Sequence, residues 1–153
     1  ELQTNQWIEG VGFRFENDEP LGALSVDTEN TLDGKSALRF YNTEDTMVFP
    51  NLSQSVPVGD AYKLRFQAFV QSKNSAIEYR QDSTKTNITL NYKTADNSLL
   101  KSETEEIRLG TYDWEPIIID SFIPQDASHV EIVLSSSVSG TIWIDGCSLI
   151  RME

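Results

Sequence analysis

The side chains able to do covalent or redox chemistry are few in this sequence. His129 is its only histidine and Cys147 its only cysteine. A His-based catalytic triad would have to use His129, which starts a predicted strand after a polar turn, where an exposed surface position is the more common state. Cys147 stands in an apolar strand without a basic neighbour, and buried cysteines of this kind are usually inert. One histidine and one cysteine also cannot supply the ligands of an ordinary zinc site.

Carboxylates are the abundant chemical groups. There are 24 Asp and Glu against 12 Lys and Arg, so the formal net charge is −12. Paired acids could serve glycoside hydrolysis, but the acids at 103–106 and 18–19 fall in polar or turn segments, which favours solvated carboxylates. The net charge disfavours nucleic acid and anionic membrane surfaces as partners. It suits a hard cation or a neutral ligand such as a sugar, and it also serves solubility alone.

The residue pattern predicts an all-β chain. Apolar and polar residues alternate through 62–70 and again through 86–94, and no amphipathic helix is found. About nine short strands separated by turn signals predict an antiparallel jelly-roll β-sandwich in two sheets, formed as a single domain over 1–153. The other strands are expected at 12–16, 23–29, 36–42, 46–56, 114–122, 129–137 and 141–150, with long surface loops at 71–85 and 95–106.

The segment SGTIWIDGCSLI at 139–150, which contains the last predicted strand, has a break in its alternation. Ile142 and Ile144 fit a core-facing row, but Cys147 and Leu149 continue that row one residue out of phase. A β-bulge at Asp145 and Gly146 would insert the extra residue and restore the pattern.

The same closing strand resembles that of jelly-roll carbohydrate-binding modules of families 4, 9, 16 and 22, a galactose-binding-domain-like sandwich. Further segments are similar to that family in the same order along the chain: WIEG at 7–10, and the segments 25–40, 56–70 and 110–134. The resemblance implies that Trp114 and Trp143 are mainly packing residues and that Trp7 fastens the N-terminal segment to the sandwich.

The resemblance also implies a structural calcium ion. Carried over residue by residue, the side-chain ligands would be Glu9 and Asp145, with Glu29 as a further candidate and Asp33 to Lys35 giving mainly backbone oxygen. Gly146 stands where the family has a second Asp, so the set is incomplete. Capping of the bulge by Asp145 is an equally supported alternative.

Sugar binding needs an aromatic face for the C–H side of the ring and polar groups for its hydroxyls. The outward residues of the predicted strands offer both kinds, and Phe69 is the most informative of them because a large apolar ring is uncommon on a solvent face. Cover of Phe69 by the 71–85 loop, with Tyr79 closing over it, is as well supported. The candidates are Arg39, Tyr41, Arg65, Gln67, Phe69, Tyr79, Asn91 and Lys93, with Tyr112 in second rank beside Tyr79.

We therefore expect a monomeric, non-catalytic carbohydrate-binding module that tethers a catalytic domain of the same parent chain to polysaccharide. The parent would be a secreted bacterial glycan-degrading enzyme, with its signal peptide outside this sequence. The acidic surface favours neutral β-glucan, xylan or mannan, with no nucleic acid or membrane as partner. A structural or adhesion domain without glycan affinity is the alternative, and a small jelly-roll lyase or hydrolase is a third hypothesis.

Overall fold

The alternating segments form two five-stranded antiparallel sheets. The structure is a computed structural model that describes residues 8–11, 24–42, 50–76 and 86–152. Its strands are β1 (Ile8–Val11), β2 (Leu24–Asp27), β3 (Ala37–Asn42), β4 (Pro50–Pro57), β5 (Lys63–Ala76), β6 (Thr86–Lys93), β7 (Leu99–Glu106), β8 (Gly110–Phe122), β9 (His129–Ser136) and β10 (Ser139–Met152). The predicted antiparallel β-sandwich is confirmed, and the described residues contain no helix that could cross a membrane.

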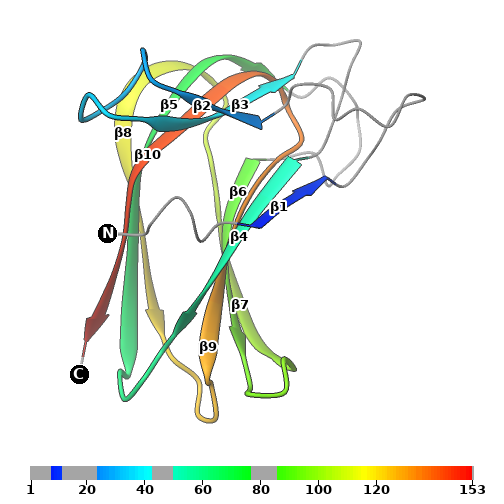
Figure 1. The fold of residues 1–153 in the computed structure, drawn as a ribbon, viewed down its shortest axis with the longest axis vertical. Coiled ribbons are helices and arrows are strands. Elements are labelled where there is room, and N and C mark those ends of the chain that lie inside the picture. Colours follow the sequence, from blue (N-terminus) through cyan, green and yellow to red (C-terminus); the bar gives the residue numbers. More distant parts are fainter. Residues whose placement is uncertain (1–7, 12–23, 43–49, 77–85, 153) are drawn as a thin grey trace.

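Two layers enclose the core. Sheet A has the strand order β1-β4-β9-β6-β7, and sheet B the order β2-β3-β10-β5-β8. In Figure 1, β5, β8 and β10 run along one side of the molecule and β4, β6, β7 and β9 along the other. The layers meet through one cluster of buried side chains, which includes Leu52, Ile88, Leu90, Tyr92, Val130, Ile132 and Leu134 from sheet A and Phe40, Leu64, Phe66, Ala68, Ile142 and Ile144 from sheet B.

The period-two alternation identified the strands with one buried face. In β5, β6 and β9 buried and half-buried residues alternate along most of the strand, because one face packs against the opposite sheet and the other is partly open to solvent. The central strands extend further than predicted, however. Residues 71–76 continue β5 and 110–113 begin β8, where loops were expected.

The predicted loop at 95–106 is wrong in its second half, because 99–106 form β7. This strand is an edge strand that pairs only with β6, and most of its side chains are exposed. Its sequence, LLKSETEE, therefore lacks the alternation of a half-buried strand, and acidic and basic residues are common on edges because they discourage pairing with other chains. The predicted strand at 12–16 lies outside the described residues.

The predicted bulge in β10 is confirmed. Asp145 pairs with Phe69 and Ser148 with Gln67, so three steps along β10 oppose two steps along β5. Gly146 takes the positive φ of 61° that this geometry needs. Ile142 and Ile144 are buried before the bulge, and Cys147 and Leu149 pack against the same core after it.

Substituting Gly146 tests how tightly the bulge is packed. A Cβ at Gly146 would lie 3.1 Å from Cδ2 of Phe69, whereas one at Gly34, which has a φ of 81°, would meet nothing within 4 Å. Both alanine variants should suffer the left-handed backbone penalty, about 1 kcal/mol, and Gly146→Ala should lose about 1 kcal/mol more. Urea unfolding of the two variants measures this difference, and equal losses would show that Phe69 yields without cost.

Candidate functional site

The outer face of sheet B carries two adjacent rows of side chains. The antiparallel register places Trp143 of β10 opposite Arg39 of β3 on one side and opposite Gln71 of β5 on the other. In the next row, Thr141 stands between Tyr41 and Lys73 in the same way. Residues paired across strands point to the same face, so the three strands build one surface around Trp143.

Trp143 is half-buried, and its indole N–H donates a hydrogen bond of 2.8 Å to Oδ2 of Asp27. The other carboxylate oxygen, Oδ1, accepts the backbone N–H groups of Glu29 and Asn30 at 2.9 and 3.1 Å. The hydrogen bond from Trp143, followed by those from the two amides, lowers the pKa of Asp27 below its ordinary value of 3.8. One carboxylate thus orients the indole ring and also shapes the first turn of the 28–36 loop.

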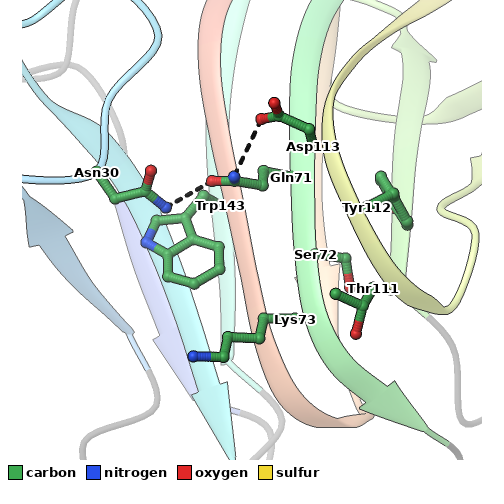
Figure 2. Close-up of a pocket in the computed structure, with 8 residues that line it drawn as sticks. All are labelled: Asn30, Gln71, Ser72, Lys73, Thr111, Tyr112, Asp113 and Trp143. Carbon is green, nitrogen blue, oxygen red and sulfur yellow. Dashed lines mark hydrogen bonds between the residues drawn. The ribbon is translucent and has the colours of Figure 1, made fainter.

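A cleft of about 410 Å³ opens over this ring. Its lining consists of Asn30, Gln71, Ser72, Lys73, Thr111, Tyr112, Asp113 and Trp143 (Figure 2). The amide of Asn30 donates to Oε1 of Gln71 at 2.5 Å, and Gln71 donates in turn to Oδ1 of Asp113 at 3.2 Å. This chain of polar groups crosses from the 28–36 loop to β8 past the Trp143 ring, as the dashed lines of Figure 2 show.

Tyr112 forms part of the wall on β8, rather than lying in a loop as expected. Its hydroxyl donates to the backbone carbonyl of Arg108 at 2.7 Å, and the guanidinium of Arg108 lies 4.2 Å from the centre of its ring. Because of these contacts the ring is held at both its edge and its face, which gives the cleft a fixed wall.

Phe69 lies on the same outer face but is half-buried. It is packed near Gly146, where the side chain of Leu32 also approaches. The backbone N–H of Leu32 donates to Oδ2 of Asp145 at 2.8 Å and thereby holds the 28–36 loop against β10. Phe69 is therefore a support beside this loop, and among the described residues Leu32 of the 28–36 loop approaches the bulge. Residues 77–85, the part of the predicted loop that was expected to cover Phe69, lie outside the described residues.

Arg65 and Gln67 lie further along β5, on the other side of Phe69. Gln67 is four residues from Gln71, a separation of about 13 Å along a strand. Arg65 forms a two-pronged ion pair with Asp120 of β8, with N–O distances of 2.8 and 2.7 Å. Its charge is thus already matched, and neither residue lines the cleft.

Asn91 and Lys93, which the sequence groups with the outward residues of β3 and β5 as sugar-binding candidates, do not share a face with them. Both belong to β6 in sheet A, whose outer face points away from sheet B. Asn91 accepts a hydrogen bond from Ser102 at 2.6 Å, and Lys93 forms an ion pair with Glu131. Alternation shows which residues face outward, but not which of the two sheets a strand joins. Tyr79 lies outside the described residues.

The residues predicted to bind calcium are only partly described. Glu29, Asp33 and Lys35 are exposed in the 28–36 loop, where Asp33 accepts the backbone N–H of Lys35 at 3.0 Å. Asp145 uses Oδ2 for Leu32 and Oδ1 for the N–H of Gly146, at 2.6 Å, so it does cap the bulge. Among the described side chains no three His, Cys, Asp or Glu gather as a metal site. Glu9 lies in β1, with its side chain outside the described part.

The residues considered for catalysis have structural partners. Nε2 of His129 lies 2.9 Å from the side-chain oxygen of Asn97 at the start of β9. Burial, and secondarily the charge of Asp145, raises the pKa of the Cys147 thiol to about 12. A thiol with so high a pKa is not a nucleophile at neutral pH.

Of the residues that line the cleft, only Tyr112 was predicted from the sequence; those not predicted are Asn30, Gln71, Ser72, Lys73, Thr111, Asp113 and, above all, Trp143. A signal for Trp143 was present, because Ile142 and Ile144 were assigned to the core and the residue between them must point outward. Continuing the alternation of β5 beyond Val70 would likewise have placed Gln71 and Lys73 beside Phe69 on the outer face.

No protein-family model and no curated protein matches this sequence. Solved structures do match its fold. The enzymatically active domain of tailspike protein 4 from bacteriophage CBA120 aligns with 97% of this chain at a TM-score of 0.72 and 13% identity, although this chain spans only 20% of that protein's length.

Two carbohydrate-binding modules match over most of their own length. A family 16 module, carbohydrate-binding module 2, aligns with 84% of this chain and 86% of its own, at a TM-score of 0.61 and 16% identity. A family 61 module solved with β-1,4-galactotriose aligns with 95% and 88%, at a TM-score of 0.61 and 15% identity. This chain therefore has the jelly-roll β-sandwich fold of carbohydrate-binding modules, as its closing strand predicted.

Proposed function

We propose that this domain is a non-catalytic carbohydrate-binding module and that the Trp143 cleft is its glycan site. The observation that carries the proposal is the setting of Trp143: a half-buried ring that lines an open cleft, is oriented by Asp27 and has amide, carboxylate, hydroxyl and ammonium groups beside it in the lining. An aromatic face stacks against the C–H side of a pyranose, and the bordering groups match its hydroxyls. The shared fold supports the proposal, and the family 61 module was solved with a galactose oligosaccharide.

The mechanism would be tethering. A module joined to a catalytic domain raises the local concentration of polysaccharide around that domain, although each binding event is weak and reversible. The parent chain would be a secreted bacterial enzyme acting on glycans. The net charge of −12 favours polysaccharides with neutral backbones, such as β-glucan, xylan or mannan, because long polyanions are repelled.

A structural or adhesion domain is the second candidate, and a separate observation favours it. The outer face of sheet B beyond Phe69 exposes Ile118, Phe122 and Ile150 around the Arg65–Asp120 ion pair. A mixed apolar and charged surface of this kind could pack against a neighbouring domain. If the domain binds glycan and the binding depends on Trp143, the carbohydrate-binding function is favoured over the structural one, because the apolar surface lies outside the cleft.

Trp143→Ala should weaken glycan binding at least about fivefold, since truncating an aromatic anchor typically removes more than about 1 kcal/mol of binding free energy. Affinity electrophoresis against soluble β-glucan, xylan, glucomannan and galactan measures the retardation. Trp114→Ala is the matched control, because Trp114 is half-buried on β8 but does not line the cleft. If none of the glycans retards the folded wild-type protein, the proposed binding function is overturned. If Trp143→Ala is retarded as strongly as the wild type, the glycan site lies elsewhere.

Asp27→Asn should weaken binding without removing any group that lines the cleft. A neutral amide has a single acceptor oxygen and cannot take the three N–H groups that Asp27 now accepts, so the Trp143 ring should lose its fixed orientation. The lowered pKa of Asp27 gives a second readout. The ionised carboxylate stabilises the folded state above pH 3.8, and this stabilisation is lost as the pH falls through the lower pKa that Asp27 has in the folded state. Tryptophan fluorescence followed between pH 6 and pH 2 should show this step in the wild type and in Asp60→Asn, an exposed turn variant, but not in Asp27→Asn.

The structural calcium stays a prediction, and melting curves test it. If calcium is bound, a chelator should lower the melting temperature of the wild type and added calcium should restore it. Asp145→Ala should melt at a lower temperature in either condition, because Leu32 and Gly146 lose their acceptor, but it should no longer respond to calcium. A wild-type melting temperature that is the same with chelator and with calcium would show that the domain has no structural calcium.

A further inference from the structure

Two cations beside Trp143 have no carboxylate partner in the described part of the chain. Most of its lysines and arginines lie within 4 Å of an acid, as expected for a chain with twice as many acids as bases. The paired cations are Lys35, Lys63, Arg65, Lys93, Lys101 and Arg108. Arg39 and Lys73, which flank Trp143, form no such pair, so no carboxylate of the described residues lies within ion-pair distance of either cation.

Arg39 is the more constrained of the two. Its guanidinium lies 5.2 Å from the centre of the Tyr41 ring, and its Nε is buried without a hydrogen-bond partner among the described residues. Asp27 feels the charge of Arg39 but has both oxygens engaged by Trp143 and by backbone amides. Because this Nε is closed to solvent, an acceptor supplied by a ligand would have to meet the outer nitrogens of the guanidinium.

The two ends of the cleft carry different groups, and Lys73 lies at one of them. In Figure 2, Asp113 and Lys73 lie at opposite ends of the lining, with Gln71 and Trp143 between them. Asp113 accepts hydrogen bonds from Gln71 and from the backbone N–H of Trp114, at 3.2 and 2.8 Å. A sugar ring stacked on Trp143 would therefore meet acceptors and amides at one end and an ammonium group at the other.

We infer that the cleft selects a sugar that bears a carboxylate, a uronic acid, attached to an otherwise neutral chain. The inference rests on the proposed function and names its ligand class. A single carboxylate directed toward Lys73 and Arg39 would form charge-assisted hydrogen bonds with two cations that have no ion-pair partner among the described residues. A continuous polyuronate would instead bring many negative charges within about 8 Å, the screening length at physiological salt, of a protein with a net charge of −12.

The experiment uses one polymer in two forms. Xylan substituted with glucuronic acid is compared with the same xylan after chemical reduction of its carboxyl groups to primary alcohols, and polygalacturonate is the third ligand. Titration calorimetry at physiological ionic strength should give at least about tenfold tighter binding to the substituted xylan than to either of the others, as expected for one charge-assisted contact of about 1.5 kcal/mol or more.

Three variants distinguish the effect of Lys73 on binding from the effect of the net charge of the protein. Lys73→Met should lose most of the preference for the unreduced polymer, whereas Lys73→Arg should keep it. Arg151→Met is the control, because it changes the net charge equally but removes an exposed cation near the far end of β10, eight residues or about 26 Å along the strand from Trp143.

The outcomes distinguish this inference from the function on which it rests. Equal binding of the unreduced and reduced polymers through Trp143 would overturn the uronate preference and leave the glycan site intact. An equal loss in Arg151→Met and Lys73→Met would assign the effect to net charge and also overturn it. Tighter binding of polygalacturonate than of substituted xylan would contradict the inferred preference for a neutral backbone. If the protein binds none of these three ligands and none of the neutral glycans tested above, both the uronate preference and the glycan-binding function are overturned.

Discussion

The pairing of β10 with β3 and β5 is the constraint on which the rest of the site depends. Because β10 is the middle strand of sheet B, its register sets which residues of β3 and β5 stand beside Trp143. The single extra residue at Gly146 then shifts the alternation, so the half of β10 before the bulge builds the cleft and the half after it continues the core. Without the extra residue, and with the pairing after the bulge unchanged, Trp143 would stand opposite Ser72 and Asp145 opposite Val70, so both side chains would turn inward.

Two aspartates convert this sheet surface into a cleft by fixing the 28–36 loop. Asp27 at the end of β2 accepts N–H groups from the start of the loop, and Asp145 accepts the N–H of Leu32 from its middle. Each carboxylate also engages β10, through the Trp143 indole in one case and the Gly146 amide in the other. The loop is thus tied to the same strand at two points, and Asn30 is brought to the edge of the cleft.

The strands with one buried face could be predicted from the sequence, because alternation follows directly from packing against an opposite sheet. The segments 62–70 and 86–94 carried that signal, and the edge strand β7 did not, because few of its side chains are buried. The assignment of strands to sheets could not be predicted in the same way. Asn91 and Lys93 point outward as expected, yet they do so from sheet A, since β6 pairs with β9 and β7 through contacts between residues distant in the sequence.

For Trp143, the family resemblance and the alternation of its own strand lead to different predictions. Trp143 was interpreted as packing because it matches a structural position of the family pattern, whereas its place between two core isoleucines requires an outward side chain. Phe69 was favoured for its outward direction, but direction alone does not measure exposure, and the 28–36 loop and Gly146 leave it half-buried.

Charge is the property for which the whole chain and the site differ most. A net charge of −12 describes the field far from the protein, where individual side chains are screened and only their sum matters. Within the cleft the neighbouring groups decide, and Asp27 and Asp113 are already engaged by N–H donors while Lys73 and Arg39 are not paired with any acid of the described chain. The cleft thus holds cations and carboxylates side by side, and they differ in their partners: the carboxylates accept N–H groups of the fold, whereas the two cations form no ion pair with the described acids.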